Sequence, residues 1–524
     1  MQTHSIPITV GVTGHRSIPK EAEEALTAAV TNELERLMKR CPHSRIVMLN
    51  SLAEGGDQLC ARAAQALSIP LIAALPLERE EYEKDFKGDA KEAFCTLYDR
   101  AEACLVVPQA EAQNGMDARD FAYRQAGVYV ASHAHVLLAL WDGEEGTSGC
   151  GAAETVRFMT DGAFAPADGA FVKTPGFVIH VFAPRGGFGG GQSAGAVRYL
   201  GDEEAFLSLL DRTDEFNRLA EGTASDARLL PPDADPDPTE TLYGVADALS
   251  MRSGKRYRAI LAALAAVSTV ITAAFLLYDE AELHGMILVC GGMLLAAWIM
   301  LHYGRRTASH RRYLEYRTLA ESLRVQTFLR YAGSDLCVSR LLPWSAQVET
   351  AWVVRALDAV TLFPSPRAPH PIRSCWVEKQ RLYHENALIR SNRAVRGSER
   401  VVGIALRVSI ALYLLVLAYE LLLGGLLPLP WALSDPEPVR TLAKLLLGSI
   451  SAATLFIANY YGKLAPKSTA STHEKMARFY LAVRNRLDRQ GQTEELLTLL
   501  AREELAENAN WCAEQRDNGI DFSL

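Results

Sequence analysis

The sequence predicts two kinds of structure in one chain: a doubly wound parallel α/β sheet domain, then an α-helical membrane region with two transmembrane hairpins and cytoplasmic helices. In the N-terminal half, short apolar runs alternate with helical patterns, which is typical of a parallel sheet. Small and polar residues follow three of those runs. In the C-terminal half, four segments are apolar over about 20 residues, the length that a helix needs to cross a bilayer.

Length and composition limit the classes of protein. The chain has 524 residues, enough for two or three domains, and a net charge of −8, which argues against a nucleic-acid partner. Its nine cysteines form no Cys-x-x-Cys pair, so we expect reduced thiols, no metal site and no resident cofactor. The first residues lack the pattern of a signal peptide, so we expect the N-terminal domain in the cytoplasm.

The N-terminal elements are expected in alternation. Strands are expected at 6–12, 45–50, 69–75, 103–108, 134–141 and 177–183. Helices are expected at 20–40, 56–67, 80–100 and 118–132. In a sheet of this type, ligands bind beyond the carboxyl ends of the strands. The residues that follow each strand are therefore the first candidates for a site.

Three strand ends and one helix supply the candidate binding residues. They are Gly11, Thr13, Gly14, His15 and Arg16 after the first strand, Ser51, Glu54, Gly55, Gly56 and Asp57 after the second, Asp142, Gly143, Gly149, Gly151 and Glu154 after the fifth, and Arg124 in the helix expected at 118–132. Glycine lets a ligand approach the backbone, and a helix start offers N–H donors to an anion. Arg16 would clamp a phosphate. Glu54, Asp57 or Asp142 would accept hydrogen bonds from a ribose or a base.

A simpler interpretation stays open for each of these loops. A glycine turn after a strand is most often only a turn, and Asp57 is placed to cap the helix that follows it. The pattern is neither a Walker A motif nor a Gly-x-Gly-x-x-Gly fingerprint. The glycine-rich segment 185–195 allows either a phosphate cradle or a flexible surface loop. The convergence of three strand ends on one edge of the sheet favours a site.

The three motifs resemble a known superfamily. They are Gly-Val-Thr-Gly-His-Arg at 11–16, Ser-Leu-Ala-Glu-Gly-Gly-Asp at 51–57, and Leu-Trp-Asp-Gly at 140–143 followed by Cys-Gly-Ala-Ala-Glu-Thr-Val at 150–156. In this order they resemble the SLOG superfamily of Rossmann-like domains, which is related to cytokinin-activating phosphoribohydrolases. The resemblance covers roughly residues 5–185. It implies a nucleotide, a cyclic nucleotide or an NAD-derived molecule as the ligand.

The resemblance also bears on catalysis. Enzymatic members carry a motif of the type Gly-Gly-x-Gly-Thr-x-x-Glu, with a catalytic arginine and glutamate. The matching stretch keeps Glu154 but has Ala152 in place of the threonine and Cys150 in place of a glycine. This departure favours a sensor without a catalytic residue. Glu154 stays a candidate for cleaving an N-glycosidic bond.

Four apolar segments follow in two pairs, at Ala259–Tyr278, Met286–His302, Val401–Leu427 and Leu442–Tyr461. Arginine and lysine flank the outer ends of each pair, whereas the turns at 279–285 and 428–440 are acidic or proline-rich. The positive-inside rule then places both termini and the central loop in the cytoplasm, with the pairs in the inner membrane. Further helices are expected at 202–221, 240–258, 345–360, 374–396 and 492–515.

An amphipathic helix is expected after each apolar pair, at 313–330 and 473–487, so a unit of hairpin and helix occurs twice. This half resembles a duplicated SLATT-type paired-transmembrane effector. The residues that carry the resemblance are Tyr-Arg-Thr-Leu-Ala-Glu-Ser-Leu-Arg-Val-Gln at 316–326, Trp-Val-Glu-Lys-Gln at 376–380, Tyr383, and Glu-Asn-Ala-Asn-Trp at 507–511.

The expected domains are a SLOG-like domain at 1–225, a linker and connecting helix at 226–258, a first hairpin with its helix at 259–335, a helical region at 336–400 and a second hairpin with C-terminal helices at 401–524.

Together the two resemblances imply a membrane effector of bacterial antiphage defence. A nucleotide second messenger, made by an enzyme encoded nearby, would bind the first domain. The spans would then oligomerise with further copies of the chain, or open, and disrupt the bilayer. Two alternatives stay open: a membrane-anchored hydrolase of nucleotides or NAD, and a transporter or constitutive channel. The clear charges of the spans, Arg407, Glu420 and Lys444, lie near the span ends, which disfavours a transporter.

Overall fold

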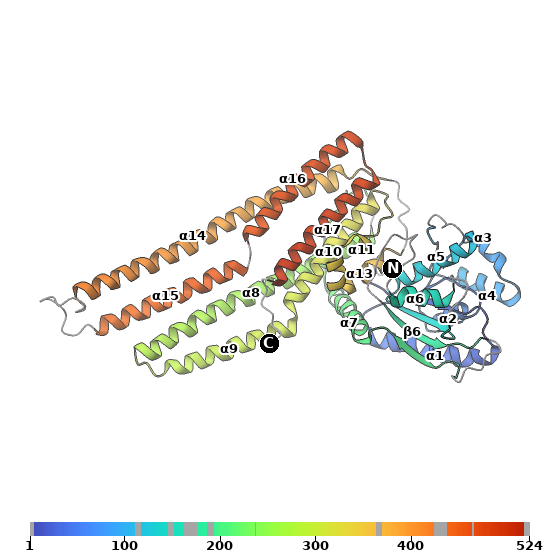
Figure 1. Cartoon of the computed structure of the whole chain (residues 1–524), viewed down its shortest axis with the longest axis horizontal. Coiled ribbons are helices and arrows are strands. Elements are labelled where there is room, and N and C mark those ends of the chain that lie inside the picture. Colours follow the sequence, from blue (N-terminus) through green and yellow to red (C-terminus); the bar gives the residue numbers. More distant parts are fainter. Residues whose placement is uncertain are drawn as a thin grey trace. The chain divides into compact units, whose positions relative to one another are not determined.

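The computed structural model shown in Figure 1 describes residues 5–109, 117–144, 151–161, 176–185, 193–235, 237–362, 369–423, 437–463 and 466–517. The chain divides into two compact units. The first unit is Met1–Ala246 with Leu319–His370, and the second is Asp247–Thr318 with Pro371–Leu524. Helices α8 (Pro238–Glu280) and α10 (Ser309–Tyr331) therefore each have residues in both units.

In the described residues, the first unit contains a seven-stranded sheet with the order β4-β3-β2-β1-β5-β6-β7. Its strands are β1 (Ile8–Gly14), β2 (Ile46–Asn50), β3 (Leu71–Leu75), β4 (Ala103–Val106), β5 (Val136–Trp141), β6 (Phe177–Phe182) and β7 (Val197–Leu200). Strands β1 to β6 pair in parallel, and β7 pairs antiparallel to β6. The strand order reverses at β1, between β2 and β5. In an open parallel sheet, such a reversal leaves a crevice at the carboxyl ends of the strands.

Helices cover both faces of the sheet. They are α1 (Lys20–Arg40), α2 (Gly56–Ala66), α3 (Arg79–Tyr82), a 3-10 turn η1 (Glu83–Asp85), α4 (Gly88–Asp99), α5 (Ala118–His133), α6 (Ala152–Asp161) and α7 (Glu203–Ala220). Ile8 and Val10 of β1 pack with residues of α1 and α2. Leu49 of β2 and Leu137 of β5 pack with residues of α5 and α6. Burial on both faces explains why these strands are apolar without alternation.

The first unit also contains a segment from far along the chain. It includes α11 (Val338–Leu341), α12 (Trp344–Glu349) and α13 (Ala351–Val360). Leu362 joins the apolar core on the α5–α6 face, and the Tyr129 hydroxyl donates a hydrogen bond to its carbonyl. The buried Arg355 donates from Nη1 to the Ala134 carbonyl at 3.2 Å. Of the segment between the second and third apolar helices, Leu319–His370 thus belongs to the sheet unit.

Three local features differ from the sequence-based expectations. The edge strand β7 was not predicted, because its residues are partly exposed and not apolar throughout. The helix expected at 80–100 is interrupted by η1 and by two non-helical residues before α4, whose first residue, Gly88, has a φ of +53°. The helix expected at 345–360 breaks at Thr350, whose backbone is not helical and whose hydroxyl donates to the Ala346 carbonyl at 2.7 Å.

Among the described residues, four helices are long and apolar enough to cross a membrane. They are α8, α9 (Met286–Thr307), which α10 follows, α14 (Lys379–Leu422) and α15 (Glu437–Lys463). Large apolar side chains stay exposed along them: Leu288 is 79%, Leu415 67% and Leu455 69% exposed. Such an apolar surface is favourable in the hydrocarbon core of a lipid bilayer and unfavourable in water. The expectation that the helix at 240–258 continues into the first apolar segment is confirmed by the single helix α8.

The apolar helices of the second unit also contact one another. Arg440 of α15 donates two hydrogen bonds to Glu420 of α14, at 2.7 and 2.8 Å. Lys444 of α15 donates to Glu280 of α8 at 2.7 Å. One turn further along α15, a Cβ on Gly448 would lie 2.7 Å from a methyl group of Leu276, so the two helices approach closely there.

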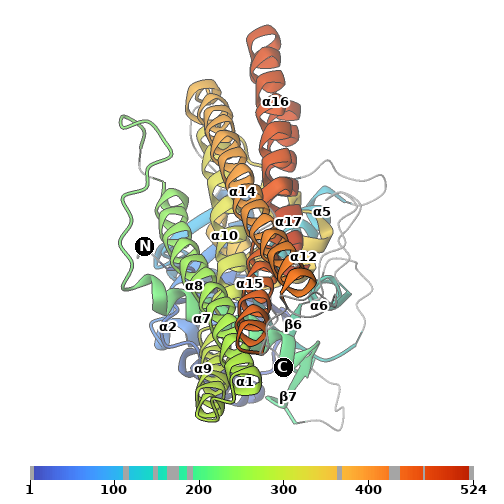
Figure 2. The ribbon, with the colours of Figure 1, turned by 90° about the vertical axis from the view of Figure 1, so that its left-hand side faces the viewer.

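The remaining helices of the second unit are α16 (Pro466–Gln490) and α17 (Glu494–Asp517). Helices α14 and α16 lie side by side (Figures 1 and 2). A wide turn at Arg373–Glu378 leads into α14. There the Trp376 indole donates to the buried Glu504 carboxylate at 3.0 Å, and the Tyr480 hydroxyl donates to its other oxygen. This polar cluster joins the start of α14 to α16 and α17.

Candidate ligand-binding site

A cavity of about 420 Å³ lies at the carboxyl ends of the central strands. Its walls come from the end of β1, the loop after β2, helix α5, the start of α6 and the residue Arg185 after β6. The candidates from the sequence that line it are Thr13, Gly14, His15, Arg16, Ser51, Asp57 and Gly151. The structure therefore brings together residues from all three predicted strand ends.

Other predicted residues lie beside the cavity and not in its wall. They are Gly11, Glu54, Gly55, Gly56, Arg124, Asp142, Gly143 and Glu154, whereas Gly149 lies outside the described residues. Gly11 has a packing role, since a Cβ there would lie 2.8 Å from the Ala134 side chain at the end of α5. Glu54 is exposed. Gly143 has a φ of +87°, which glycine adopts without strain.

Three glycines let the β1 loop and the start of α2 meet. A Cβ on Gly14 would lie 2.9 Å from the Gly56 Cα, and a Cβ on Gly55 would lie 2.3 Å from the His15 carbonyl oxygen. The Gly56 N–H donates to that same carbonyl at 2.9 Å. Gly55 also has a φ of +87°. Any side chain at these positions would push apart the two loops that form one wall of the cavity.

The loop after β2 is held by the buried side chain of Asn50. Its carbonyl oxygen accepts from the Leu52 N–H at 2.7 Å, and its amide donates to the Asp57 carbonyl at 2.8 Å. Leu52 has a φ of 58°, a strained conformation for a leucine. Such strain persists only where the surroundings impose it, and it is commoner at functional sites. Here it turns Ser51 and Ala53, the residues on either side of Leu52, into the cavity wall.

Asp57 is a buried carboxylic acid at the base of the cavity. Burial raises its pKa to about 7, although backbone hydrogen bonds from Ala53 and Gly14 and the charge of Arg16 oppose the shift. Near neutral pH the acid is therefore partly protonated. A neutral acid at this place would not repel an anionic ligand.

His15, Asp142 and Arg185 form a cluster at the cavity. The Asp142 carboxylate lies 3.1 Å from Nε2 of His15 and 2.8 Å from Nε of Arg185. Burial lowers the pKa of His15, and the neighbouring charge of Arg185 adds to this effect, while Asp142 opposes it. A neutral His15 can accept a hydrogen bond from the Asp142 N–H, which lies 3.1 Å away. Asp142 thus holds the two cavity-lining side chains without lining the cavity itself.

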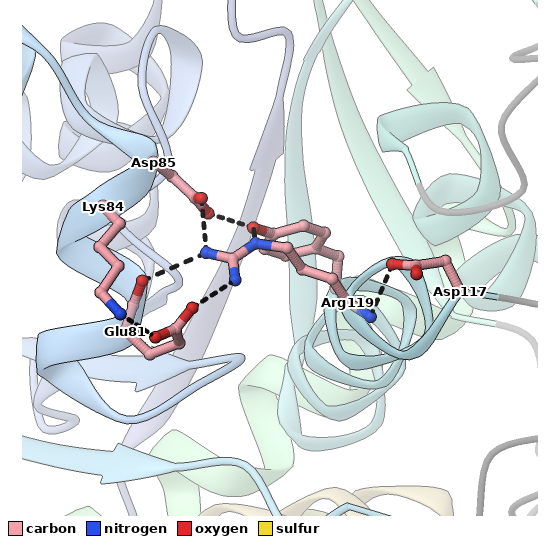
Figure 3. Close-up of polar contacts among 6 residues, drawn as sticks. Glu81, Lys84, Asp85, Asp117 and Arg119 are labelled. Atoms are coloured by element: carbon pink, nitrogen blue, oxygen red, sulfur yellow. Dashed lines mark hydrogen bonds and ion pairs between the residues drawn. The ribbon is translucent and has the colours of Figure 1, made fainter.

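Aromatic rings also line the cavity. The Arg16 guanidinium lies 5.0 Å from the centre of the Tyr123 ring, and the buried Tyr82 lies beside Tyr123. Figure 3 shows how α5 fixes this wall: Arg119 donates to Glu81 at 2.8 Å and to Asp85 at 2.5 Å. The Tyr123 hydroxyl, which also donates to Asp85, accepts from Arg119 at 2.9 Å. The rings are therefore fixed in place before any ligand binds.

The start of α6 forms part of the cavity wall. Gly151, Ala152 and Ala153 line it, so the first turn of the helix faces the space. The N–H groups of a first turn have no partners within their helix, and the helix dipole adds positive potential. Gly127 of α5 allows this approach, since a Cβ there would lie 2.5 Å from the Thr155 hydroxyl. This wall suits an anion.

Glu154, the candidate catalytic glutamate, forms ion pairs outside the cavity wall. The Glu154 carboxylate lies 3.0 Å from Arg157 and 3.5 Å from Arg124. Glu154 and Arg124 do not line the cavity, although their neighbours Ala153 and Tyr123 do. As the side chains stand, the pair joins α5 to α6.

Sequence reasoning did not single out several cavity residues, namely Tyr82, Asp120, Tyr123 and Arg185; it considered Arg185 only as the first residue of the glycine-rich segment 185–195. Three of them could have been found. Asp120, Tyr123 and Gly127 are spaced three and four residues apart, so they share one face of α5. Arg124 borders the same face but does not line the cavity. Arg185 follows the sixth strand and obeys the same strand-end rule as Arg16. Tyr82 carries no such signal, because the turn that places it was not predicted.

Fold and site together define a class: an α/β domain with a charged, aromatic-lined cavity, in one chain with four helices able to span a membrane. Within the described ranges, no group of three or more histidine, cysteine, aspartate or glutamate residues could hold a metal ion. The sequence matches no protein-family model and no curated protein. The cavity and the apolar helices therefore carry the functional argument.

Proposed function

We propose that this chain is a membrane-embedded effector with a Rossmann-like sensor domain of the SLOG type. The sensor binds a nucleotide or a nucleotide-derived second messenger. In response, the chain oligomerises or opens and disrupts the inner membrane, as part of a bacterial antiphage defence. The observation that carries the proposal is the cavity, which offers cations, a helix start and tyrosine rings in the same chain as four apolar helices.

The chemistry of the cavity supports a nucleotide. Arg16, Arg185 and the first turn of α6 suit phosphate oxygens. Tyr82 and Tyr123 offer aromatic surface to a base. Ser51 and Asp120 offer hydroxyl and carboxylate groups to a ribose. The volume lies within the range of ~300–1,000 Å³ that is usual for small-molecule sites.

Two continuous helices support the transmission of a signal. Helix α8 has its first residues in the sheet unit and its last residues in an apolar segment, and α10 has residues in both units. A ligand shifts the equilibrium between a resting and an active conformation only if it binds the active conformation more tightly. The membrane topology that we propose, two hairpins with both termini in the cytoplasm, puts the sensor where a signal made inside the cell is present.

The ends of the apolar helices support an assembly of several chains. The charged side chains Glu280, Glu420, Arg440 and Lys444 pair with one another near these ends. In the described part of the apolar helices, these pairs hold the charges towards the helix ends and not at their middle. We propose that disruption needs homo-oligomers.

Ligand screening of the full chain in detergent tests the sensor. Thermal stabilisation would be measured with nucleotides, cyclic oligonucleotides and NAD-derived cyclic products. A ligand that binds only the folded state at 100 times its Kd stabilises by about 2.7 kcal/mol. Arg16→Ala removes one charge-assisted contact of about 1.5–3 kcal/mol, so the Kd should rise about 10- to 150-fold. Arg62→Ala, on the exposed side of α2, is the matched control and should leave the Kd unchanged.

Two results would contradict the sensor. One is that none of these molecules stabilises the protein. The other is that Arg16→Ala and Arg62→Ala weaken binding equally, because the cavity would then not be the site.

The second candidate function is a membrane-anchored hydrolase of nucleotides or NAD. It is favoured by one observation: Arg124 and Glu154, an arginine and a glutamate of the catalytic types, lie 3.5 Å apart beside the cavity. If the chain is such an enzyme, Glu154→Gln abolishes release of the free base while the ligand still binds. Binding of a ligand that stays intact over hours would exclude it.

A further inference from the structure

Exposed cations lie at the open end of the first pair of apolar helices. On α8, Arg252, Lys255 and Arg256 are exposed and come shortly before the apolar segment. On α9, Arg305 and Arg306 are exposed and lie in the last turn of the helix, just after its apolar part. Both helices therefore change from apolar to cationic at this end.

The acidic residues nearest to these cations along the chain pair with other arginines. Asp247 of α8 pairs with Arg317 at 3.1 Å, and Glu315 of α10 pairs with Arg311 at 3.1 Å. Within the part of the chain that the structure describes, the exposed cations of α8 and α9 named above form no ion pair with a carboxylate. Their charges are therefore available to a partner outside the chain.

Two contacts fix the register of α8 against α9, which lie side by side (Figures 1 and 2). Sγ of Cys290 lies 3.8 Å from the carbonyl oxygen of Ile271, and eleven residues further along α9, Leu301 packs against the cluster that includes Ile260. Ile260 is also eleven residues from Ile271, in the opposite direction, so the helices are antiparallel. Four residues beyond this contact, the same register brings Arg256 level with Arg305.

The cationic end of α9 continues into an exposed aromatic and apolar face. Trp298 is 62% exposed, and its ring stacks on His302 with the centres 5.7 Å apart. Trp298, His302 and Arg305 are spaced four and three residues apart, so they share one face of the helix. Leu295, almost one turn before Trp298, and Tyr303 are exposed as well. Along this face, apolar, aromatic and cationic side chains follow one another.

This order matches the depth profile of a lipid leaflet. Hydrocarbon suits the leucine, tryptophan and tyrosine favour the interface, and arginine reaches the phosphate level. A nucleic acid would offer phosphates to the cations but no acyl chains to the apolar part of the face. Each lysine or arginine near the surface of an anionic membrane contributes about 1 kcal/mol, which corresponds to about fivefold in affinity. The observations therefore favour a lipid over a soluble polyanion.

We propose that Arg256, Arg305 and Arg306, with Trp298 and Tyr303, form a boundary surface that binds the headgroup of an anionic phospholipid. The guanidinium groups donate hydrogen bonds to the phosphate oxygens, and the two rings lie against the glycerol and the upper acyl chains. A zwitterionic headgroup carries a cation of its own, so it binds less tightly. The proposal requires that α8 and α9 cross the bilayer, but it does not depend on the sensor.

Fluorescence quenching of the full chain in lipid nanodiscs tests the boundary surface. Brominated phosphatidylglycerol or brominated phosphatidylcholine replaces a small fraction of unlabelled phosphatidylcholine, and bromine quenches tryptophan at short range. The signal of Trp298 is the difference between each protein and its own Trp298→Phe version. We expect phosphatidylglycerol to be preferred at Trp298 by at least about fivefold at low salt. The preference should shrink at about 1 M salt, where charges are screened.

Variants separate the boundary surface from a general effect of charge. Arg256→Gln, Arg305→Gln and Arg306→Gln in one protein should bring the preference close to one, whereas lysine at the same three positions should retain it. The matched control replaces three exposed cations of the sheet unit, Lys20, Arg62 and Lys87, by glutamine and should behave as the wild type. If the triple glutamine variant fails to fold, Arg306→Gln alone decides, with a preference about fivefold lower.

The proposal is overturned if the wild type shows no preference for phosphatidylglycerol at Trp298, or if the triple glutamine variant retains the wild-type preference. It is also overturned if duplex DNA at about 0.15 M salt abolishes the preference, because the cations would then serve a nucleic acid. No ligand of the cavity enters these measurements. Failure of the sensor would appear elsewhere, as absent ligand stabilisation, so the two proposals can fail independently.

Discussion

At the scale of single residues, the cavity combines charges of both signs. Arg16 and Arg185 bring positive charge, and Asp57 is a buried acid at the base. A permanent negative charge there would oppose a phosphate. Because burial raises the pKa of Asp57 to about 7, the protein keeps this charge partly neutral under cellular conditions.

The raised pKa predicts how stability depends on pH. The folded state binds a proton at Asp57 that the unfolded state loses above about pH 4, so this acid destabilises the fold progressively between about pH 4 and pH 7. The full cost above pH 7 is about 4 kcal/mol. Asp57→Asn should therefore raise the melting temperature of the full chain at pH 8, and the gain should shrink towards pH 5. An equal gain at both pH values would contradict the account.

At this scale, the sequence predicted the cavity residues that directly follow a strand. Thr13, His15 and Arg16 directly follow an apolar strand, and strand ends share one edge of the sheet. Tyr123 was missed and its neighbour Arg124 was named instead, because the sequence does not show which side of α5 faces the cavity. Tyr82 depends on a short irregular turn at α3 and η1, which a helical pattern at 80–100 conceals.

At the scale of elements, the buried strands were the easiest to predict. Strands β2, β3 and β6 are buried at every position, so their sequence is continuously apolar. The apolar helices carry an even stronger signal, because lipid tolerates few charges. Breaks within helices, such as that at Thr350, depend on tertiary contacts and leave little trace in the sequence.

Helix α13 gives a prediction at the scale of elements. Trp352 is 1% exposed and lies near Phe216 of α7, with the ring centres 6.1 Å apart. Trp352→Ala should destabilise the sheet unit by about 3–5 kcal/mol, because it leaves a large cavity in the core. Hydrogen exchange of the full chain should show faster exchange in β1 and β5. Trp344→Ala, at a tryptophan that is 51% exposed, is the control and should leave these strands protected.

If Trp352→Ala left β1 and β5 as protected as in the wild type, α13 would not belong to the core of the sheet unit. Membership of this segment could not be predicted from the sequence. More than 100 residues and two apolar helices lie between α7 and α13, and contacts across such a separation leave no periodic pattern. The expected domain boundaries therefore treated residues 336–400 as a separate helical region.

At the scale of the whole molecule, the proposed signal passes along the chain from the cavity to the apolar helices. Two routes lead out of the sheet unit, along α8 and along α10. The sequence predicted both kinds of structure, because each has its own hydrophobic pattern. The ligand and the number of chains in an active assembly depend on surfaces that single-chain patterns do not encode.

The central claim is that filling the cavity makes the chain disrupt a membrane. The most direct test reconstitutes the full chain in liposomes loaded with a fluorescent dye and adds the nucleotide, cyclic oligonucleotide or NAD-derived product that stabilises the protein most. The account predicts that dye release requires this molecule, in the wild type and in Arg62→Ala alike. In Arg16→Ala, release should need a concentration of the molecule about 10- to 150-fold higher. Release without the molecule, or binding of the molecule without release, would contradict the claim.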